Sequence, residues 1–353
     1  MVDLPMTSRE RVLATVNHEL PDRVPVHVMG FDAIGPFCDR FGLHEVDDVR
    51  QALELDVVWV TPSYVGPEVP EGLSYWGTHN IADNAGYSQS RQHNPLANAT
   101  TLAEIESFPW PSPGEFDYPS LQKHAEIIGE RAAGLNLGWE PIFCRILDLF
   151  GMEAGMMAMR TDPSLIEAAV SHIEEYVMEK MVRSLDVVAD RIDFFWYGDD
   201  FATQRGMMIR PEDWKRFFAP TYRRLIDTAR DYGLKNWFHA CGAFPEVMPD
   251  LVDMGIDVWE TSQVHLAGNN PEKLKREFGK QITFCGGINT QWTLPFGTTE
   301  DVRREVREHI AVLGKGGGYI CGPDHTVRPE VPVDNVVAML DEAKSFRGQG
   351  YTL

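Results

Sequence analysis

Ile192-Asp-Phe-Phe-Trp-Tyr-Gly-Asp-Asp200 is the stretch of sequence that decides the fold class. Its first part, up to Tyr197, is short, apolar and aromatic, and a glycine and two carboxylates follow it directly. A brief apolar run of this kind is typical of a parallel strand that is covered on both faces. The sequence therefore predicts a buried strand with polar side chains at its carboxyl end.

Similar short apolar runs recur along the chain. With the first, they make eight expected strands, at 24–29, 56–60, 135–139, 192–197, 237–241, 257–260, 281–285 and 318–321. Amphipathic stretches typical of helices separate the later ones, at 163–188, 211–232, 244–254, 271–278, 299–313 and 335–346. This alternation predicts an α/β protein with a parallel sheet, a (β/α)8 TIM barrel that forms one domain over residues 1–353.

Residues 61–119 interrupt the alternation. The segment is rich in proline, glycine, asparagine and tryptophan, as in Phe108-Pro-Trp-Pro-Ser-Pro113. Such residues favour turns and loops over regular elements. We expect a loop-rich insertion or lid after the second strand, with an ordinary surface excursion as the alternative.

The composition narrows the class of protein. The formal net charge of -21 argues against nucleic-acid binding, because an acidic surface repels phosphate backbones. No apolar run reaches the length of about 18 residues that a membrane span needs, and the first residues do not resemble a secretory signal. The five cysteines are too sparse for a disulfide framework. We therefore expect a cytoplasmic protein with free thiols.

His239-Ala-Cys241-Gly is the sharpest chemical signal in the sequence. Its imidazole and thiol are two residues apart at the end of an expected strand, so they point to the same side. Both are ligands that suit zinc. Cys321 ends the last expected strand and His325 lies in the loop after it, and both are candidates for further ligands. The alternative is that His239 and Cys241 are ordinary core residues.

Two other strand ends carry polar groups. Asp199 is a candidate metal ligand, acid–base group or substrate anchor, and capping of the next segment is the alternative. The glycines of Cys285-Gly-Gly-Ile-Asn289 allow a ligand to approach the backbone closely, and Asn289 can hydrogen-bond it. A tight turn is the alternative at that position.

Together these motifs resemble the uroporphyrinogen decarboxylase superfamily, and within it the zinc- and corrinoid-dependent methyltransferase branch. The resemblance covers most of the chain. It depends on the order of Ser8-Arg-Glu-Arg-Val-Leu13, Gly198-Asp-Asp-Phe-Ala-Thr-Gln204, His239-Ala-Cys241-Gly, Cys285-Gly-Gly-Ile-Asn-Thr-Gln291 and Pro329-Glu-Val-Pro-Val-Asp-Asn335.

The resemblance implies zinc held by His-x-Cys and a later cysteine. His239 and Cys241 match the first part directly. At the position of the later cysteine this chain has His325, with Cys321 four residues upstream. The third ligand therefore stays open between these two residues, or both bind.

Two departures bear on the reaction. Porphyrinogen decarboxylases of this superfamily carry an arginine-rich segment after the first strand, where this chain has Met29-Gly-Phe-Asp-Ala-Ile-Gly35. Decarboxylation without a metal is therefore the weaker alternative. The chain also lacks an Asp-x-His-x-x-Gly corrinoid-binding motif. A corrinoid (cobalamin) would come on a partner protein or as a free cofactor.

The resemblance thus implies a zinc-dependent methyltransferase. It would move a methyl group between a small O-, N- or S-methyl compound and a corrinoid, thiol or folate acceptor, for instance as a component of an aromatic methyl ether demethylase. We expect acid–base or orienting work from Asp199, substrate contacts from Gln263 and Asn289, and an apolar wall from Trp139. A homodimer is expected, and a non-catalytic scaffold is the remaining alternative.

Overall fold

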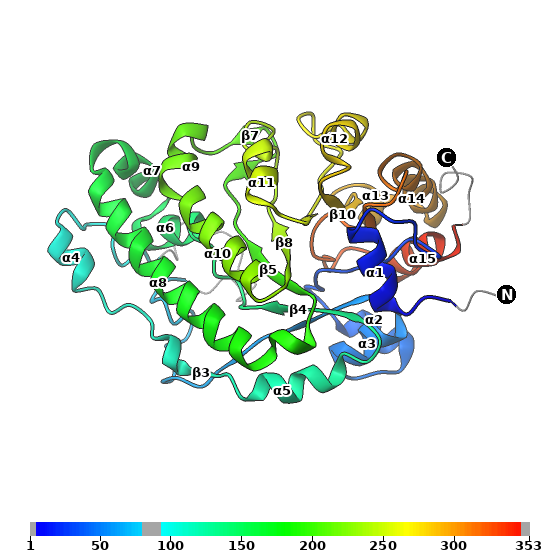
Figure 1. The fold of residues 1–353 in the computed structure, drawn as a ribbon, viewed down its shortest axis with the longest axis horizontal. Coiled ribbons are helices and arrows are strands. Elements are labelled where there is room, and N and C mark those ends of the chain that lie inside the picture. Colours follow the sequence, from blue (N-terminus) through cyan, green and yellow to red (C-terminus); the bar gives the residue numbers. More distant parts are fainter. Residues whose placement is uncertain (1–4, 80–92, 347–353) are drawn as a thin grey trace.

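One curved sheet of seven parallel strands forms the centre of the molecule, in the order β1-β4-β5-β8-β9-β10-β11 (Figure 1). The computed structural model describes residues 5–79 and 93–346. The strands are β1 (Val57–Val60), β4 (Ala132–Asn136), β5 (Phe194–Gly198), β8 (Lys235–His239), β9 (Val258–Glu260), β10 (Thr283–Ile288) and β11 (Tyr319–Pro323). They confirm the expected strands other than the first, with shifts of a few residues at their ends.

The expected first strand, 24–29, lies where it is needed to close the barrel but is not a regular strand. The N–H of Cys321 on β11 donates to the carbonyl of Pro25 at 2.9 Å. On the other side, the N–H of Asp56 donates to the carbonyl of Val26 at 3.0 Å. The segment therefore bridges the two edges of the sheet, and proline, which has no N–H, limits its ladder to an isolated bridge. The predicted barrel architecture is confirmed with this irregularity.

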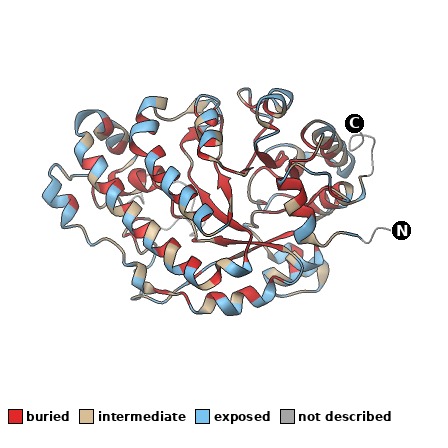
Figure 2. Ribbon diagram, viewed as in Figure 1, coloured by how far each residue is buried: buried red, intermediate tan, exposed pale blue. Residues whose placement is uncertain are grey.

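Helices cover the outside of the sheet, and buried residues gather on the strands and on the inner helix faces (Figure 2). The helices are α1 (Ser8–Val16), α2 (Gly35–Phe41), α3 (Val46–Ala52), α4 (Leu102–Glu106), α5 (Ser120–His124), α6 (Phe143–Phe150), α7 (Met152–Thr161), α8 (Pro163–Val188), α9 (Pro211–Phe217), α10 (Ala219–Asp231), α11 (Met248–Met254), α12 (Pro271–Phe278), α13 (Thr293–Phe296), α14 (Thr299–Leu313) and α15 (Val333–Ser345). Short 3₁₀ helices occur at η2 (Pro113–Glu115), η3 (Ala125–Ile127) and η4 (Ala189–Arg191). Within the described ranges no helix has both the length and the apolar character needed to span a bilayer.

The helix expected at 211–232 is two helices, α9 and α10, which meet at Phe218. Pro220 is the second residue of α10 and has no N–H to continue the hydrogen-bond ladder of α9. The helical spacing of apolar residues over this range therefore predicted one helix where the chain forms two.

Residues 61–119 contain little regular structure in their described part. β2 (Ser63–Tyr64) pairs antiparallel with β3 (Phe116–Asp117), and α4 lies between them in sequence. A second short hairpin, β6 (Ala202–Thr203) with β7 (Gly206–Met207), follows β5. The lid role of the larger segment stays a prediction, and residues 80–92 of it lie outside the described residues.

The large segment is fastened to the barrel by the buried carboxylate of Glu140, just after β4. Tyr75 and Trp76 donate hydrogen bonds to it at 2.5 and 3.0 Å. Lys180 of α8 contributes a fully buried ion pair at 2.6 Å. A buried charge is tolerated when it is paired and hydrogen-bonded in this way, and removal of either partner is costly.

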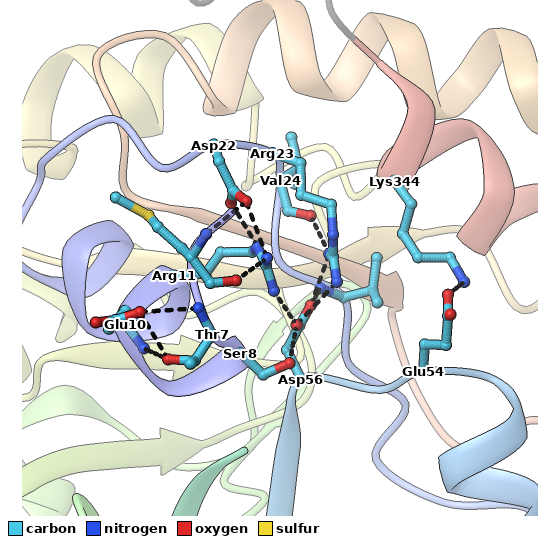
Figure 3. Close-up of polar contacts among 12 residues, drawn as sticks. Thr7, Ser8, Glu10, Arg11, Asp22, Arg23, Val24, Glu54, Asp56 and Lys344 are labelled. Carbon is cyan, nitrogen blue, oxygen red and sulfur yellow. Dashed lines mark hydrogen bonds and ion pairs between the residues drawn. The ribbon is translucent and has the colours of Figure 1, made fainter. Parts of the chain in front are cut away.

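A second buried carboxylate fixes the amino-terminal end of the barrel (Figure 3). Asp56 receives ion pairs from Arg11 at 2.7 Å and Arg23 at 2.8 Å. It also accepts hydrogen bonds from Ser8 Oγ at 2.7 Å and from the N–H of Val26 at 2.8 Å. These contacts join α1, the irregular first segment and the start of β1 at the end of the barrel opposite the candidate site, where side chains serve stability.

Candidate metal centre

The centre is built at the carboxyl end of the sheet, where barrel enzymes place their chemistry. β8 ends at His239, and Cys241 follows two residues later on the same side. His239 Nε2 lies 3.6 Å from Cys241 Sγ and 3.6 Å from Asp200 Oδ1. One ligand atom from each of these three residues lies within 4.8 Å of the others. A nitrogen, a sulfur and an oxygen at this spacing fit a zinc ion.

Asp200 is a member of this group that sequence reasoning passed over in favour of its neighbour Asp199. Its carboxylate accepts the N–H of Cys241 at 2.9 Å, which also fixes the loop after β8. Burial by itself would raise the pKa of Asp200, but the hydrogen bond and charge of His239 hold it below its usual value. Asp200 is therefore an anionic group at the centre.

The thiol of Cys241 is placed between two histidines. Burial would raise its pKa, but the nearby charge and hydrogen bond of His239, together with the electrostatic influence of His325, lower it overall. The pKa of His325 is raised by the same contact, against the opposing effect of burial. A lowered thiol pKa favours the thiolate, which is the form that binds metal. His325, on the loop after β11, interacts electrostatically with Cys241 but does not belong to the group of ligand atoms that lie within 4.8 Å of one another.

Glu260 stands behind His239, on the side away from the sulfur. Its carboxylate lies 3.4 Å from His239 Nδ1 and 2.9 Å from His27 Nε2. Trp196 Nε1 donates a hydrogen bond to it at 2.7 Å. Burial would raise the pKa of Glu260, but the two histidines lower it, so the carboxylate is ionised. A carboxylate at Nδ1 fixes the tautomer that leaves Nε2 free for a metal.

Cys321 lies apart from this group. It sits on β11 opposite Gly286 and is fully buried. Burial raises the pKa of its thiol to about 12, which disfavours the thiolate. Neither of the two candidates that the sequence left open belongs to the converging group, and His325 is the one that interacts electrostatically with Cys241, so the choice between them stays a prediction.

Asp199, the expected acid–base group, is turned away from the centre. Its carboxylate accepts the backbone N–H groups of Ile142, Phe143 and Cys144 at 2.8, 2.6 and 3.0 Å, and the hydroxyl of Tyr222 at 2.8 Å. These contacts cap the amino end of α6. Burial outweighs them and raises the pKa of Asp199 to about 6. Asp199 thus caps a helix that precedes it in the chain, not the next segment that the alternative named, and the acid–base role stays a prediction without a contact to support it.

Of the three expected substrate residues, Trp139 and Gln263 lie beside the centre and its loop, and Asn289 lies in a separate pocket. The Trp139 ring packs edge-on against His239, with centroids 5.6 Å apart, and forms a wall of the centre. Gln263 Oε1 accepts the N–H of Gly242 at 2.7 Å and so holds the loop that carries Cys241. Asn289 lines a separate pocket between β10 and α14. Substrate contacts by these residues remain a prediction.

Comparisons with known proteins agree with this architecture. A family model described as uroporphyrinogen decarboxylase (URO-D) matches residues 148–346. Curated uroporphyrinogen decarboxylases from Syntrophotalea carbinolica and Solibacter usitatus are 28% and 27% identical over 142 and 140 residues. These matches span 38% of this chain and 38% and 37% of the two relatives. A solved methyltransferase structure from Methanosarcina mazei is similar in fold, with a TM-score of 0.69 and 16% identity over 97% of this chain and 100% of the other.

Proposed function

The chain belongs to the uroporphyrinogen decarboxylase family. Within this family, we propose that it is a zinc-dependent methyltransferase, which moves a methyl group to or from a small molecule. The observation that carries the proposal is the convergence of Asp200, His239 and Cys241 at the carboxyl end of the barrel. The fold shared with a methyltransferase supports the choice of reaction.

Asp200, His239 and Cys241 would hold the metal. A set of three protein ligands would resemble catalytic zinc sites, which also bind water or substrate, whereas a scaffold would hold the ion with protein ligands alone. His325, which interacts with Cys241, is the further candidate ligand. Bound zinc would supply Lewis acidity to the methyl-bearing or methyl-accepting heteroatom.

The residues around the ligands have distinct tasks in this proposal. Glu260 orients His239 through Nδ1. Trp139 covers the imidazole and excludes water from that side. Gln263 keeps the loop after β8 in place. An apolar aromatic wall suits a methyl group and would suit an aromatic methyl ether, while N- and S-methyl compounds remain within the proposal.

A corrinoid is the proposed methyl carrier, supplied by a partner protein or free, with a thiol or folate as the other acceptors. The metal-free decarboxylase is the competing function. It needs basic groups to hold the carboxylates of its substrate, yet the described hydrogen-bond and ion-pair partners of His239 and Cys241 include no lysine or arginine. The centre instead contains the carboxylates of Asp200 and Glu260, which would repel such a substrate.

Metal content is the first test. Wild-type protein purified without added metal should contain about one zinc per chain, Cys241→Ala should lose it, and Cys38→Ala, a free cysteine on α2, should retain it. Absence of zinc from the wild type, even after reconstitution, rejects the metal centre. Zinc-loaded protein is then assayed with a reduced corrinoid and a panel of O-, N- and S-methyl compounds. A chain that holds zinc but transfers no methyl group from or to any of them rejects the methyltransferase while keeping the metal site.

A further inference from the structure

A second pocket, of about 590 Å³, lies beside the centre between the end of β10, α13 and α14. His265 and Asn289 are among its lining residues and come from the loops after β9 and β10. His265 lies 3.0 Å from Asp324, the residue that precedes His325. The pocket therefore opens at the same end of the barrel as the metal centre, but it contains none of the proposed metal ligands.

One wall of this pocket is aromatic and open to solvent. Trp292 and Phe296 are 68% and 70% exposed, and their ring centroids are 6.1 Å apart. Among the large hydrophobic side chains that the described part of the chain exposes, these two are the aromatic ones. Exposed aromatic surface at the rim of a pocket marks a place where a ligand or partner is bound.

The helix α14 contributes two carboxylates to the pocket lining. Glu305 and Glu308 lie three residues apart on α14, so they share one face of the helix and both line the pocket. Glu305 accepts the N–H of Asn289 at 2.9 Å, and neither glutamate has a lysine or arginine partner among the described ion pairs. The lining arginine, Arg304, is already paired with Asp301 at 2.6 Å.

The half-buried Glu305 is the more unusual of these two carboxylates. Burial raises its pKa and the charge of Asp324 adds to this, whereas hydrogen bonds from Thr293 and the N–H of Asn289 and the charge of His265 lower it. The net shift is upward, so these groups supply less than a full counter-charge. A cation entering the pocket would provide one, in a place partly shielded from water where the interaction is stronger than at an open surface.

We propose that this pocket binds an organic cation with apolar surface, such as a quaternary or protonated alkylammonium group. Its apolar part would contact the faces of Trp292 and Phe296, and its charge would be met by Glu305 and Glu308. Aromatic faces combined with carboxylates are how proteins recognise alkylammonium groups. The site is independent of the metal and of the proposed methyl transfer.

Choline and its neutral isostere 3,3-dimethyl-1-butanol are the probes that separate charge from shape. In calorimetric titrations of the full chain, choline should bind about two- to fivefold more tightly than the alcohol, as expected for a cation–π contact with exposed rings. Trp292→Ala and Glu305→Gln should each weaken choline binding several-fold. Matched controls are Leu102→Ala, an exposed apolar residue on α4, and Glu71→Gln, an exposed carboxylate, and both should bind as the wild type does.

Circular dichroism establishes that each variant is folded, and the exposure of Trp292 makes loss of the fold on its truncation unexpected. Equal binding of the two probes, binding that survives Trp292→Ala, or no binding of choline would each overturn the assignment. Dimers that Trp292→Ala dissociates, with no choline binding, would assign the aromatic wall to a contact between chains. The titration is repeated on Cys241→Ala, where unchanged choline binding separates this site from the metal centre.

Discussion

Replacement of Glu260 tests how the metal centre is organised. Its buried carboxylate lies 3.4 Å from His239 Nδ1 and 2.9 Å from His27 Nε2, and it accepts a hydrogen bond from Trp196 at 2.7 Å. An ionised carboxylate on the Nδ1 side favours the metal-binding tautomer, with the proton on Nδ1 and Nε2 on the side of the Cys241 sulfur. Zinc affinity should therefore depend on a residue that does not bind the metal.

Glu260→Gln keeps the size of the side chain and removes its charge. Loss of an outer carboxylate that holds a ligating histidine weakens metal binding by about 10- to 100-fold, or about 1.4–2.8 kcal/mol. Two imidazoles depend on this one carboxylate, so we expect the upper part of the range. The Kd for zinc is measured by competition with a chromogenic chelator, and thermal unfolding of the metal-free protein reports on the fold separately.

Glu305→Gln is the matched control, because it makes the same chemical change on α14, outside the proposed ligand set. Its Kd for zinc should equal that of the wild type. A Glu260→Gln protein that is folded and binds zinc as tightly as the wild type would refute the orienting role. It would leave Glu260 as a buried anion that serves only the packing of His27 and Trp196.

Three further predictions concern neighbouring residues. Burial raises the pKa of Asp199 from 3.8 to about 6, so this carboxyl should make the fold less stable as pH rises between those values, by on the order of 3 kcal/mol. Asp199→Asn should remove this pH dependence of the free energy of unfolding, measured with urea at several pH values, and an unchanged pH dependence contradicts the reasoning. Lys180→Met leaves the buried carboxylate of Glu140 without its counter-charge and should lower the free energy of unfolding by about 3–5 kcal/mol. Arg183→Met, in a solvent-exposed pair, should lower it by under about 1 kcal/mol, and equal losses would argue against a role for burial. Cys321→Ala should retain zinc while His325→Ala should bind it more weakly, and the opposite pattern of metal contents would assign Cys321 as the ligand.

The sheet could be predicted from sequence because buried parallel strands are short apolar runs separated by long helices. The first segment, 24–29, was placed correctly but is irregular, because Pro25 removes a donor from its ladder. The division of 211–232 into two helices also comes from a proline, Pro220. In both places the spacing of apolar residues predicted the correct type of structure, and a proline without an N–H interrupted its hydrogen bonding.

The choice between Asp199 and Asp200 could not be made from residue type, because both are carboxylates at the end of one strand. It depends on which side of the strand each faces. Gly198 pairs in register with His239, and a methyl group added at Gly198 would come within 2.9 Å of the His239 Cβ. Positions 198 and 200 therefore share the side of His239 and Cys241, while Asp199 faces outward to α6.

The same alternation separates Cys321 from His325. Ile320 packs with Cys285 in the cluster that fills the barrel interior, whereas Cys321, one residue later, packs in the larger cluster between sheet and helices. A thiol on that side cannot share an ion with Cys241 without a shift of the strand by one residue, which would turn every side chain of β11 over. His325 escapes this constraint because β11 has ended at Pro323 and the loop is free to turn back toward the centre. Alternation along a strand therefore accounts for Asp200 and Cys241, which lie two residues beyond the ends of β5 and β8, but not for the more distant loop residue His325.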